Sequence, residues 1–176
     1  SEFSEVFFDG ARTTADLVVG EEHGGWKVAM GTLAFERGVY TLGQQIGFQN
    51  ELESVLAIAR RNGAAGEPHL RQRLARAWMG LRVMRWNALR TLGGTEAGEL
   101  GRAATIGKLY WSEWHRGLGE LAMDGLGGEA EVAEPDSDAA ALQRVFLFSR
   151  ADTIYAGTSE IQKNLIGERA LGLPPE

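Results

Sequence analysis

Apolar residues in this chain repeat with the spacing of an α-helix over most of its length. Between residues 25 and 61 they recur every three or four positions, and Asn62-Gly63 then provides a stop signal. A second periodic stretch begins at Pro68, which suits the first turn of a helix, and runs to Leu92 before two glycines. The pattern predicts two long amphipathic helices in the first half of the chain.

Three further helices are predicted in the second half, over residues 95–123, 137–149 and 159–170. Thr95 is the expected cap of the first of these, and a glycine cluster at 125, 127 and 128 is its expected end. Acidic, loop-like residues separate it from the next helix. The fold class that follows is all-α, an up-down helical bundle.

The N-terminal residues follow a different pattern. Residues 3–8 alternate weakly between apolar and polar, which predicts a short strand or its remnant, and residues 11–22 read as a loop. The chain begins abruptly at Ser1, as a cut chain would. The expected architecture is therefore a bundle with a short N-terminal strand or loop remnant.

Composition narrows the function classes. A chain of 176 residues with 44% hydrophobic content is of ordinary size for one globular domain, and its net charge of −6 argues against nucleic-acid binding. It has no cysteine, no apolar run long enough to span a membrane and no signal peptide, which is compatible with a cytoplasmic location. His23, His69 and His115 are scattered, so no metal site is predicted.

The segment from Ile154 to Asn164 carries the most specific chemistry. Ala156 and Gly157 are small residues in a turn, and Thr158 or Ser159 can cap the helix that follows. Such a helix start offers backbone N–H groups to a carbonyl oxygen or a phosphate. The alternative is an ordinary capping motif without a ligand.

This segment resembles the C-terminal signature of the acyl-CoA dehydrogenases, which here reads Tyr-Ala-Gly-Thr-Ser-Glu-Ile-Gln followed by Lys-Asn-Leu-Ile-Gly-Glu-Arg-Ala-Leu-Gly-Leu-Pro. Residues 6–10, 17–26 and 33–38 are similar to the family's passage from its middle β domain into its C-terminal helical domain. The resemblance covers nearly the whole chain. It implies that residues 1–22 are the end of the β domain and a linker, that residues 23–176 are the helical domain, and that the isolated fragment is inactive.

The reaction that the resemblance implies is α,β-dehydrogenation of an acyl-CoA thioester by an FAD enzyme. Many family members carry the base, a glutamate, at the position of Ala156, and a methyl group cannot accept a proton. The isovaleryl-CoA and long-chain branch instead carries it just before an arginine on the first long helix, where this chain has Glu36-Arg37. Glu36 shares a helix face with Leu33 and Tyr40, and desolvation there would raise its affinity for a proton. The alternative is a structural ion pair.

The resemblance assigns further residues to substrate and cofactor. It places the backbone N–H of Ala156 against the thioester oxygen and Arg60 or Arg61 at the flavin pyrophosphate of a neighbouring subunit. The other implied substrate positions are Tyr40, Gly43, Tyr155 and Gly157. The other implied flavin positions are Asp124, Gly127, Gly128, Thr158 and Glu160.

Some of these positions depart from the family pattern. Asp124 stands where the family has a glutamine, and an acid beside a diphosphate would repel it. Leu147 and Phe148 replace an Arg-Asp pair, and the Phe-Gly that follows the family's arginine is missing after Arg60-Arg61. These departures leave the flavin site of this chain in question.

Three functions therefore compete. The first is an acyl-CoA dehydrogenase of fatty acid and lipid metabolism that uses Glu36, passes electrons to an acceptor flavoprotein and assembles as a homo- or hetero-oligomer, a dimer of dimers. The second is a non-catalytic partner subunit of a mixed tetramer. The third is a related oxidase that passes electrons to oxygen.

Overall fold

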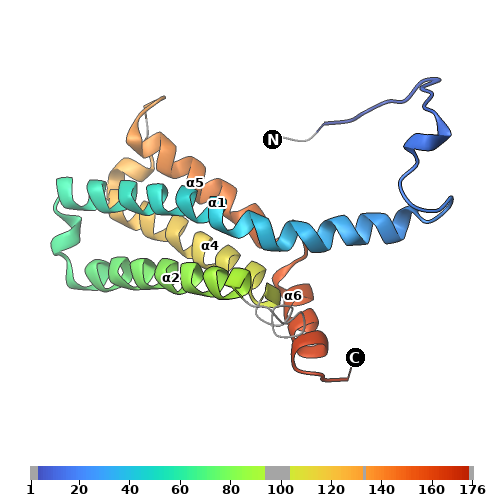
Figure 1. Cartoon of the computed structure of the whole chain (residues 1–176). Coiled ribbons are helices and arrows are strands. Elements are labelled where there is room, and N and C mark those ends of the chain that lie inside the picture. Colours follow the sequence, from blue (N-terminus) through green and yellow to red (C-terminus); the bar gives the residue numbers. More distant parts are fainter. Residues whose placement is uncertain (1–3, 94–103, 133, 175–176) are drawn as a thin grey trace. The chain divides into compact units, whose positions relative to one another are not determined.

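The computed structural model describes residues 4–93, 104–132 and 134–174, without the side chains of residues 33–41, 92 and 93. The main helices of the described chain are α1 (Gly25–Arg61), α2 (Pro68–Gly93), α4 (Gly107–Leu126), α5 (Asp138–Asp152) and α6 (Ser159–Leu165), which continues as a π-helix (Ile166–Ala170) (Figure 1). Short 3-10 turns lie at Ala15–Leu17, Ala64–Gly66 and Gly127–Ala130. The described residues contain no strand, so the all-α fold class is confirmed.

The chain divides into two compact units, Ser1–Glu36 and Arg37–Glu176, and the boundary falls within α1. In the first unit, residues 4–14 are irregular and precede the 3-10 turn, where the Leu17 amide donates to the Thr14 carbonyl at 3.1 Å. The predicted strand at residues 3–8 is therefore wrong for the part that is described, residues 4–8. A strand needs a neighbour to pair its N–H and C=O groups, and the described residues supply none.

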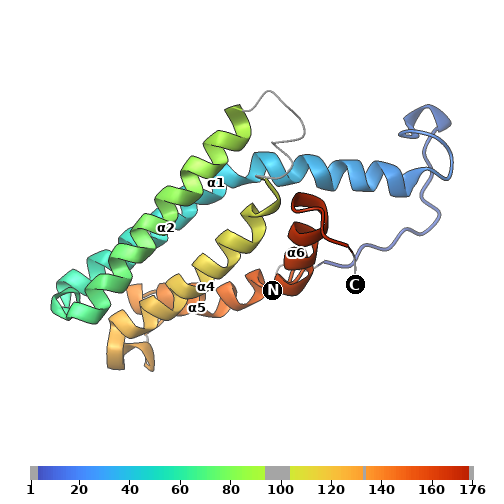
Figure 2. The same ribbon diagram turned by 90° about the horizontal axis from the view of Figure 1, so that it is seen from below.

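The second unit buries one apolar core between four helices, α1 from residue 37, α2, α4 and α5, which lie side by side (Figures 1 and 2). The apolar stripe of α2 is buried as its periodicity predicted, whereas in α1 only the C-terminal part is, and Trp26 and Ile46 of that helix are exposed. At about 1.5–3 kcal/mol for each fully buried large side chain, this core is the main source of stability. The larger buried members are Phe48, Leu52, Val55, Ile58, Leu70, Leu74, Leu81, Met84, Leu118, Leu121, Leu126 and Leu142.

Local signals set most helix ends. Gly63 adopts a left-handed φ of 82° after α1, and α2 starts at Pro68, as predicted. The Ser137 hydroxyl caps α5 by accepting from the Ala140 amide at 3.1 Å. α4 ends at Leu126 rather than the predicted Met123, because the turn with φ of 60° is made at Gly127. The predicted start of that helix at Thr95 lies outside the described residues.

Two glycines let α4 approach its neighbours. A Cβ at Gly80 of α2 would lie 2.7 Å from the Trp114 ring, and one at Gly119 of α4 would lie 2.9 Å from the Phe146 Cα of α5. The Trp114 indole N–H also donates to the Ala77 carbonyl at 2.9 Å. The packing of α4 against α2 and α5 therefore depends on residues without side chains at the crossing points.

The outer face of α2 carries large apolar side chains that this chain leaves exposed. They are Trp78, Met79, Val83, Trp86 and Leu89. The Arg82 guanidinium lies over the Trp78 ring at 5.0 Å. None of the helices in the described part of the chain is both long and apolar enough to cross a membrane.

Candidate active site

The candidate active site is built on the signature turn, residues 154–158, between α5 and α6. Ala156 has a φ of 54° and Gly157 a φ of 97°. The Gln162 side chain, buried on α6, donates from Nε2 to the Ala156 carbonyl at 3.0 Å. A Cβ at Gly157 would lie 2.7 Å from the same Nε2, and a φ of 97° is one that residues with a Cβ rarely adopt, so this position favours glycine.

The orientation of the turn leaves a backbone donor available. The Ile154 and Tyr155 amides both donate to the Ala151 carbonyl, at 2.8 and 3.1 Å. For the Ala156 amide, by contrast, the described residues provide no acceptor. This N–H is therefore free of an acceptor within the described chain, and its role as a donor to a ligand carbonyl stays a prediction.

The turn leads into the capped start of α6. The Thr158 hydroxyl accepts from the Ile161 amide at 3.4 Å, and the Ser159 hydroxyl donates to Glu113 of α4 at 2.7 Å. Its own backbone N–H and then the Thr158 hydroxyl lower the pKa of Glu160, which keeps that carboxyl ionised. A shallow groove of about 630 Å³ runs along this surface, lined by Leu109, Glu113, Arg116, Thr153, Ile154, Thr158, Ser159, Glu160 and Lys163.

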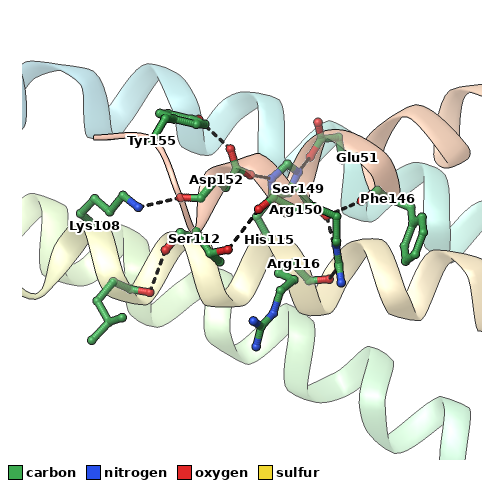
Figure 3. Close-up of polar contacts among 12 residues, drawn as sticks. Glu51, Lys108, Ser112, His115, Arg116, Phe146, Ser149, Arg150, Asp152 and Tyr155 are labelled. Atoms are coloured by element: carbon green, nitrogen blue, oxygen red, sulfur yellow. Dashed lines mark hydrogen bonds and ion pairs between the residues drawn. The ribbon is translucent and has the colours of Figure 1, made fainter. Parts of the chain in front are cut away.

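A polar network centred on the buried His115 and Asp152 lies beside the turn (Figure 3). The His115 Nε2 bonds Glu51 of α1 at 2.7 Å, and its Nδ1 bonds Asp152, the last residue of α5. The Tyr155 hydroxyl donates to the other Asp152 carboxylate oxygen at 2.6 Å, and the Lys108 ammonium donates to the Asp152 carbonyl at 2.6 Å. This network ties the signature turn to α1, α4 and α5.

The network shifts three pKa values. Burial lowers the pKa of His115, but its hydrogen bonds to Asp152 and Glu51 and the charges of these carboxylates outweigh burial and raise it to about 9. Burial, followed by the bond to Asp152, raises the pKa of Tyr155. Burial lowers the pKa of Lys108 against the opposing charges of Asp152 and Glu113. At neutral pH the histidine is therefore a cation.

Sequence reasoning missed this network. In the sequence His115 is one of three scattered histidines, although it follows the buried Ser112 by three residues and precedes the buried Leu118 by three. A polar residue in the middle of an apolar stripe is the signal that marks it. Its partners could not be identified in the same way, because Glu51 and Asp152 lie 64 and 37 residues away in the chain.

A second group of predicted residues lies at the opposite end of α4. Arg61 pairs with Asp138 at 2.9 Å, whereas Arg60 is exposed and has no ion pair to any described residue. Asp124 pairs with Arg73 of α2. The positive charge of Arg73 offsets the negative charge of Asp124, which was expected to repel a diphosphate. A groove of about 610 Å³ is present there, lined by Asn62, Gly63, Ala64, Asp124, Gly125, Leu126, Gly127, Gly128 and Glu129.

The two groups of predicted residues are separated by the length of a helix. α4 has 20 residues, which at 1.5 Å per residue is about 30 Å. Tyr155, Ala156 and Gly157 lie near its start and Gly127 and Gly128 follow its end. The structure therefore brings the predicted substrate and flavin residues together in two clusters rather than one.

The remaining predicted residues lie on α1. The side chains of Glu36 and Tyr40 fall outside the described set. Gly43 is exposed, and a Cβ built on it would meet no atom within 4 Å. Their assignment to the base and the substrate stays a prediction.

Comparison with known proteins identifies the class. The family model of the acyl-CoA dehydrogenase C-terminal domain matches residues 23–171. The chain belongs to the acyl-CoA dehydrogenase family and forms its C-terminal helical domain.

Two similar proteins are also described as acyl-CoA dehydrogenases. The chain is similar to "Acyl-CoA dehydrogenase IpdE1" of Mycobacterium tuberculosis, with 55% identity over the whole chain and 45% of the relative. It is 52% identical to the protein of the same description from Mycolicibacterium smegmatis, of which it covers 44%. The chain thus spans less than half the length of these relatives.

Solved structures show the same fold. The structure titled "Tcur3481-Tcur3483 steroid ACAD" superposes with a TM-score of 0.79 at 26% identity, over 97% of this chain and 45% of that one. The "FAD complex of PigA" superposes with a TM-score of 0.72 at 24% identity, over 88% of this chain and 40% of that one.

Proposed function

We propose that this chain is the C-terminal portion of an FAD-dependent acyl-CoA dehydrogenase in which Glu36 removes the α proton of the thioester. The observation that carries the proposal is the signature turn, where the strained Ala156 leaves its N–H without an acceptor in the described chain. A main-chain donor does not depend on the side chain, so the replacement of the family's glutamate by alanine removes a base and keeps the donor. Glu36 then fills the other base position of the family.

The proposed roles follow from general acid–base chemistry. The carboxylate takes the proton from the carbon next to the thioester carbonyl, and negative charge develops on the thioester oxygen. A fixed N–H donor stabilises that charge more strongly than water does, because it is already oriented when the charge appears. Tyr155 and Gly157 would border the thioester, and Tyr40 and Gly43 would border the acyl chain along α1.

The residues present are compatible with a flavin. Arg60 is exposed and has no ion pair to a described residue, Asp124 is offset by Arg73, and Cβ atoms at Gly127 and Gly128 would meet nothing within 4 Å. These residues would hold the pyrophosphate region, since a guanidinium matches phosphate oxygens. Thr158 and Glu160, at the other end of α4, would lie near the flavin. When bound, FAD supplies the acceptor for hydride from the β carbon.

Assembly with further subunits is part of the proposal. The two clusters lie about 30 Å apart along one helix, which fits contributions to two different sites in an oligomer. The exposed tryptophans 78 and 86 on α2 are the kind of side chain that subunit interfaces cover. An acyl-CoA substrate and an electron-acceptor flavoprotein complete the proposed set of partners.

The base is tested by Glu36→Gln in the full-length protein. We expect kcat to fall by about 10²- to 10⁴-fold, the usual range for a general base, while the flavin absorbance per chain stays unchanged. Glu53→Gln is the matched control, because Glu53 is exposed on the same helix and bonds only Gln49 among the described residues. Near-normal turnover of Glu36→Gln would exclude Glu36 as the base.

A gain-of-function variant sharpens this test. Adding Ala156→Glu to Glu36→Gln puts a carboxylate at the family's more common base position, and part of the lost activity should return. Ala156→Gln in the same background keeps the size of the side chain without the base and should restore nothing. Equal activities of the Glu and Gln variants would show that position 156 does not face the α carbon.

A second candidate function is a partner subunit without a flavin of its own. Arg61 is engaged by Asp138 instead of being free, and one similar solved structure carries two protein names in its title, Tcur3481-Tcur3483. Flavin stoichiometry separates the two functions. One flavin per chain of the purified full-length protein supports the catalytic subunit, whereas flavin that appears only with a second subunit type supports the partner role.

A further inference from the structure

A buried ionic network lies directly behind the signature turn and joins three helices (Figure 3). His115 and Asp152 are only 4% and 1% exposed, and the Phe48 ring covers the imidazole at a centroid distance of 4.6 Å. Charges this deeply buried are tolerated only when they are paired and hydrogen-bonded. The network is therefore a fixed part of the structure rather than a surface ion pair.

The bonding pattern determines the protonation state of His115. Each ring nitrogen bonds a carboxylate oxygen, Nε2 to Glu51 and Nδ1 to Asp152. Ionised carboxylates only accept hydrogen bonds, so both ring nitrogens must carry a proton. His115 is an imidazolium that holds two carboxylates from different helices.

Asp152 passes this constraint on to the turn. One of its carboxylate oxygens is fixed by His115, and the other accepts from the Tyr155 hydroxyl at 2.6 Å. Its main-chain carbonyl accepts from Lys108 at 2.6 Å. Asp152 therefore makes all three bonds. One of them holds Tyr155, which directly precedes Ala156.

The turn needs such support because its backbone is strained. Ala156 has a φ of 54°, a conformation that costs a residue with a Cβ about 1–2 kcal/mol. Gln162 holds the carbonyl side of Ala156, and the Tyr155–Asp152 bond holds the preceding side. Ala156 is thus held through its own carbonyl on one side and through the side chain of the preceding residue on the other.

We propose that His115 and Asp152 are positioning residues for the signature turn: the imidazolium holds Asp152, Asp152 holds the Tyr155 hydroxyl, and the Ala156 N–H is thereby kept in the orientation that receives the thioester oxygen. This inference rests on the proposed function for its catalytic consequence. The structural part, that His115 rigidifies the turn through Asp152 and Tyr155, stands by itself.

The charged and titratable groups around the imidazole come from each helix that packs on it. Glu51 of α1 and Asp152 of α5 bond the ring itself, while Tyr155 of the turn and Lys108 of α4 bond Asp152. Glu113 and Arg150 are two residues from His115 and Asp152 in the chain. Glu113 is paired with Arg116 at 2.7 Å and Arg150 with Glu120 at 2.8 Å. The two carboxylates that face His115 therefore depend on its positive charge, because the neutral ring has one N–H and can donate to only one of them.

Hydrogen exchange of the turn in the full-length, flavin-loaded protein tests the positioning. With millisecond labelling and mass spectrometry, His115→Gln and Tyr155→Phe should each raise exchange in the peptide spanning 153–158. The double variant should exchange no faster than the faster single one, because both changes break the same chain of bonds. Ser112→Ala is the control, since Ser112 is buried one turn away and bonds only its own helix within the described residues.

If His115→Gln does not fold, hydrogen exchange of the wild-type protein measured over a series of pH values tests the same proposal. After correction for intrinsic exchange, protection of the 153–158 peptide should fall as the pH passes about 9, the pKa of His115. Protection of the α2 peptide spanning 70–84 should not change over the same range. Protection of the turn that is independent of pH, or unchanged in Tyr155→Phe, would overturn the proposal.

Steady-state kinetics test the catalytic consequence. His115→Gln and Tyr155→Phe should lower kcat by roughly 10- to 100-fold, as expected for a displaced donor, with a much smaller change in KM. If the full-length protein has no dehydrogenase activity, the proposed function is wrong. The exchange data then still show whether His115 positions the turn. In an active protein, unchanged kcat in both variants overturns the catalytic part of the inference.

Discussion

At the scale of single residues, His115 links stability to pH. Its pKa is about 9 in the folded protein against 6.5 for an ordinary histidine, despite burial, because Asp152 and Glu51 stabilise the charged form. Because folding raises the pKa of His115, protonation of this residue stabilises the folded protein. The full stabilisation is present below about pH 6.5 and is lost as the pH rises through about 9. The rise from 6.5 to about 9 corresponds to an upper limit of about 3 kcal/mol.

This linkage gives a direct prediction. Chemical denaturation of the wild-type chain should show a free energy of unfolding that falls between pH 6.5 and 9.5. His115→Gln should be less stable at pH 6.5 and should lose most of this pH dependence, whereas His69→Gln should keep it, since His69 is exposed on the first turn of α2. Parallel pH profiles for the wild type and His115→Gln would show that His115 does not carry the linkage.

The residue scale is also where sequence reasoning reached its limit. Ala156, Gly157 and Thr158 were identifiable because a turn and a helix cap are defined by neighbouring residues. The bond from His115 to Glu51 joins positions 64 residues apart, and no local pattern encodes that distance. Gln162 was missed as well, since its bond to the Ala156 carbonyl exists only once α6 has folded back onto the turn.

At the scale of helices, boundaries were predictable wherever a local stop signal exists. Gly63, Pro68, Ser137 and Thr158 each mark the end or start that the structure has. The end of α4 was misplaced because Gly125 resembles a terminator in sequence, although it is buried inside the helix. Tertiary contacts decide which of several glycines ends a helix.

The crossing of α4 and α5 gives a prediction with a built-in control. A Cβ at Gly119 would lie 2.9 Å from the Phe146 Cα and 2.7 Å from the Ser149 hydroxyl. Because backbone cannot move aside cheaply, Gly119→Ala should destabilise the protein by about 1–3 kcal/mol. Gly117→Ala, on the same helix with open space around the new Cβ, should instead stabilise it by about 0.5–1 kcal/mol.

Denaturant unfolding of the two alanine variants measures this difference. Both changes add one methyl group to α4, so the intrinsic gain in helix propensity is the same for each. Only the space at the crossing distinguishes them. A Gly119→Ala variant as stable as Gly117→Ala would mean that α4 and α5 lie farther apart than the structure has them.

At the scale of the whole chain, the stabilising interactions are distributed unevenly. Every residue from 4 to 23 is exposed, and among the described side chains the buried apolar core begins at Phe48. The C-terminal segment contributes differently, because Ser159 and Gln162 are buried and bond Glu113 and the Ala156 carbonyl. The two ends of the chain are therefore expected to respond differently to truncation.

Deleting residues 1–24 should leave the thermal unfolding midpoint of this chain within about 2 °C of the original, because none of the described residues in this segment is buried. Deleting residues 159–176 removes two bonds to partly buried groups, which should cost about 1–3 kcal/mol and lower the midpoint by several degrees. Differential scanning calorimetry of both truncations measures the contrast. A large loss on N-terminal truncation would show that the residues before α1 support the bundle, and it would move the functional boundary of the domain toward the N-terminus.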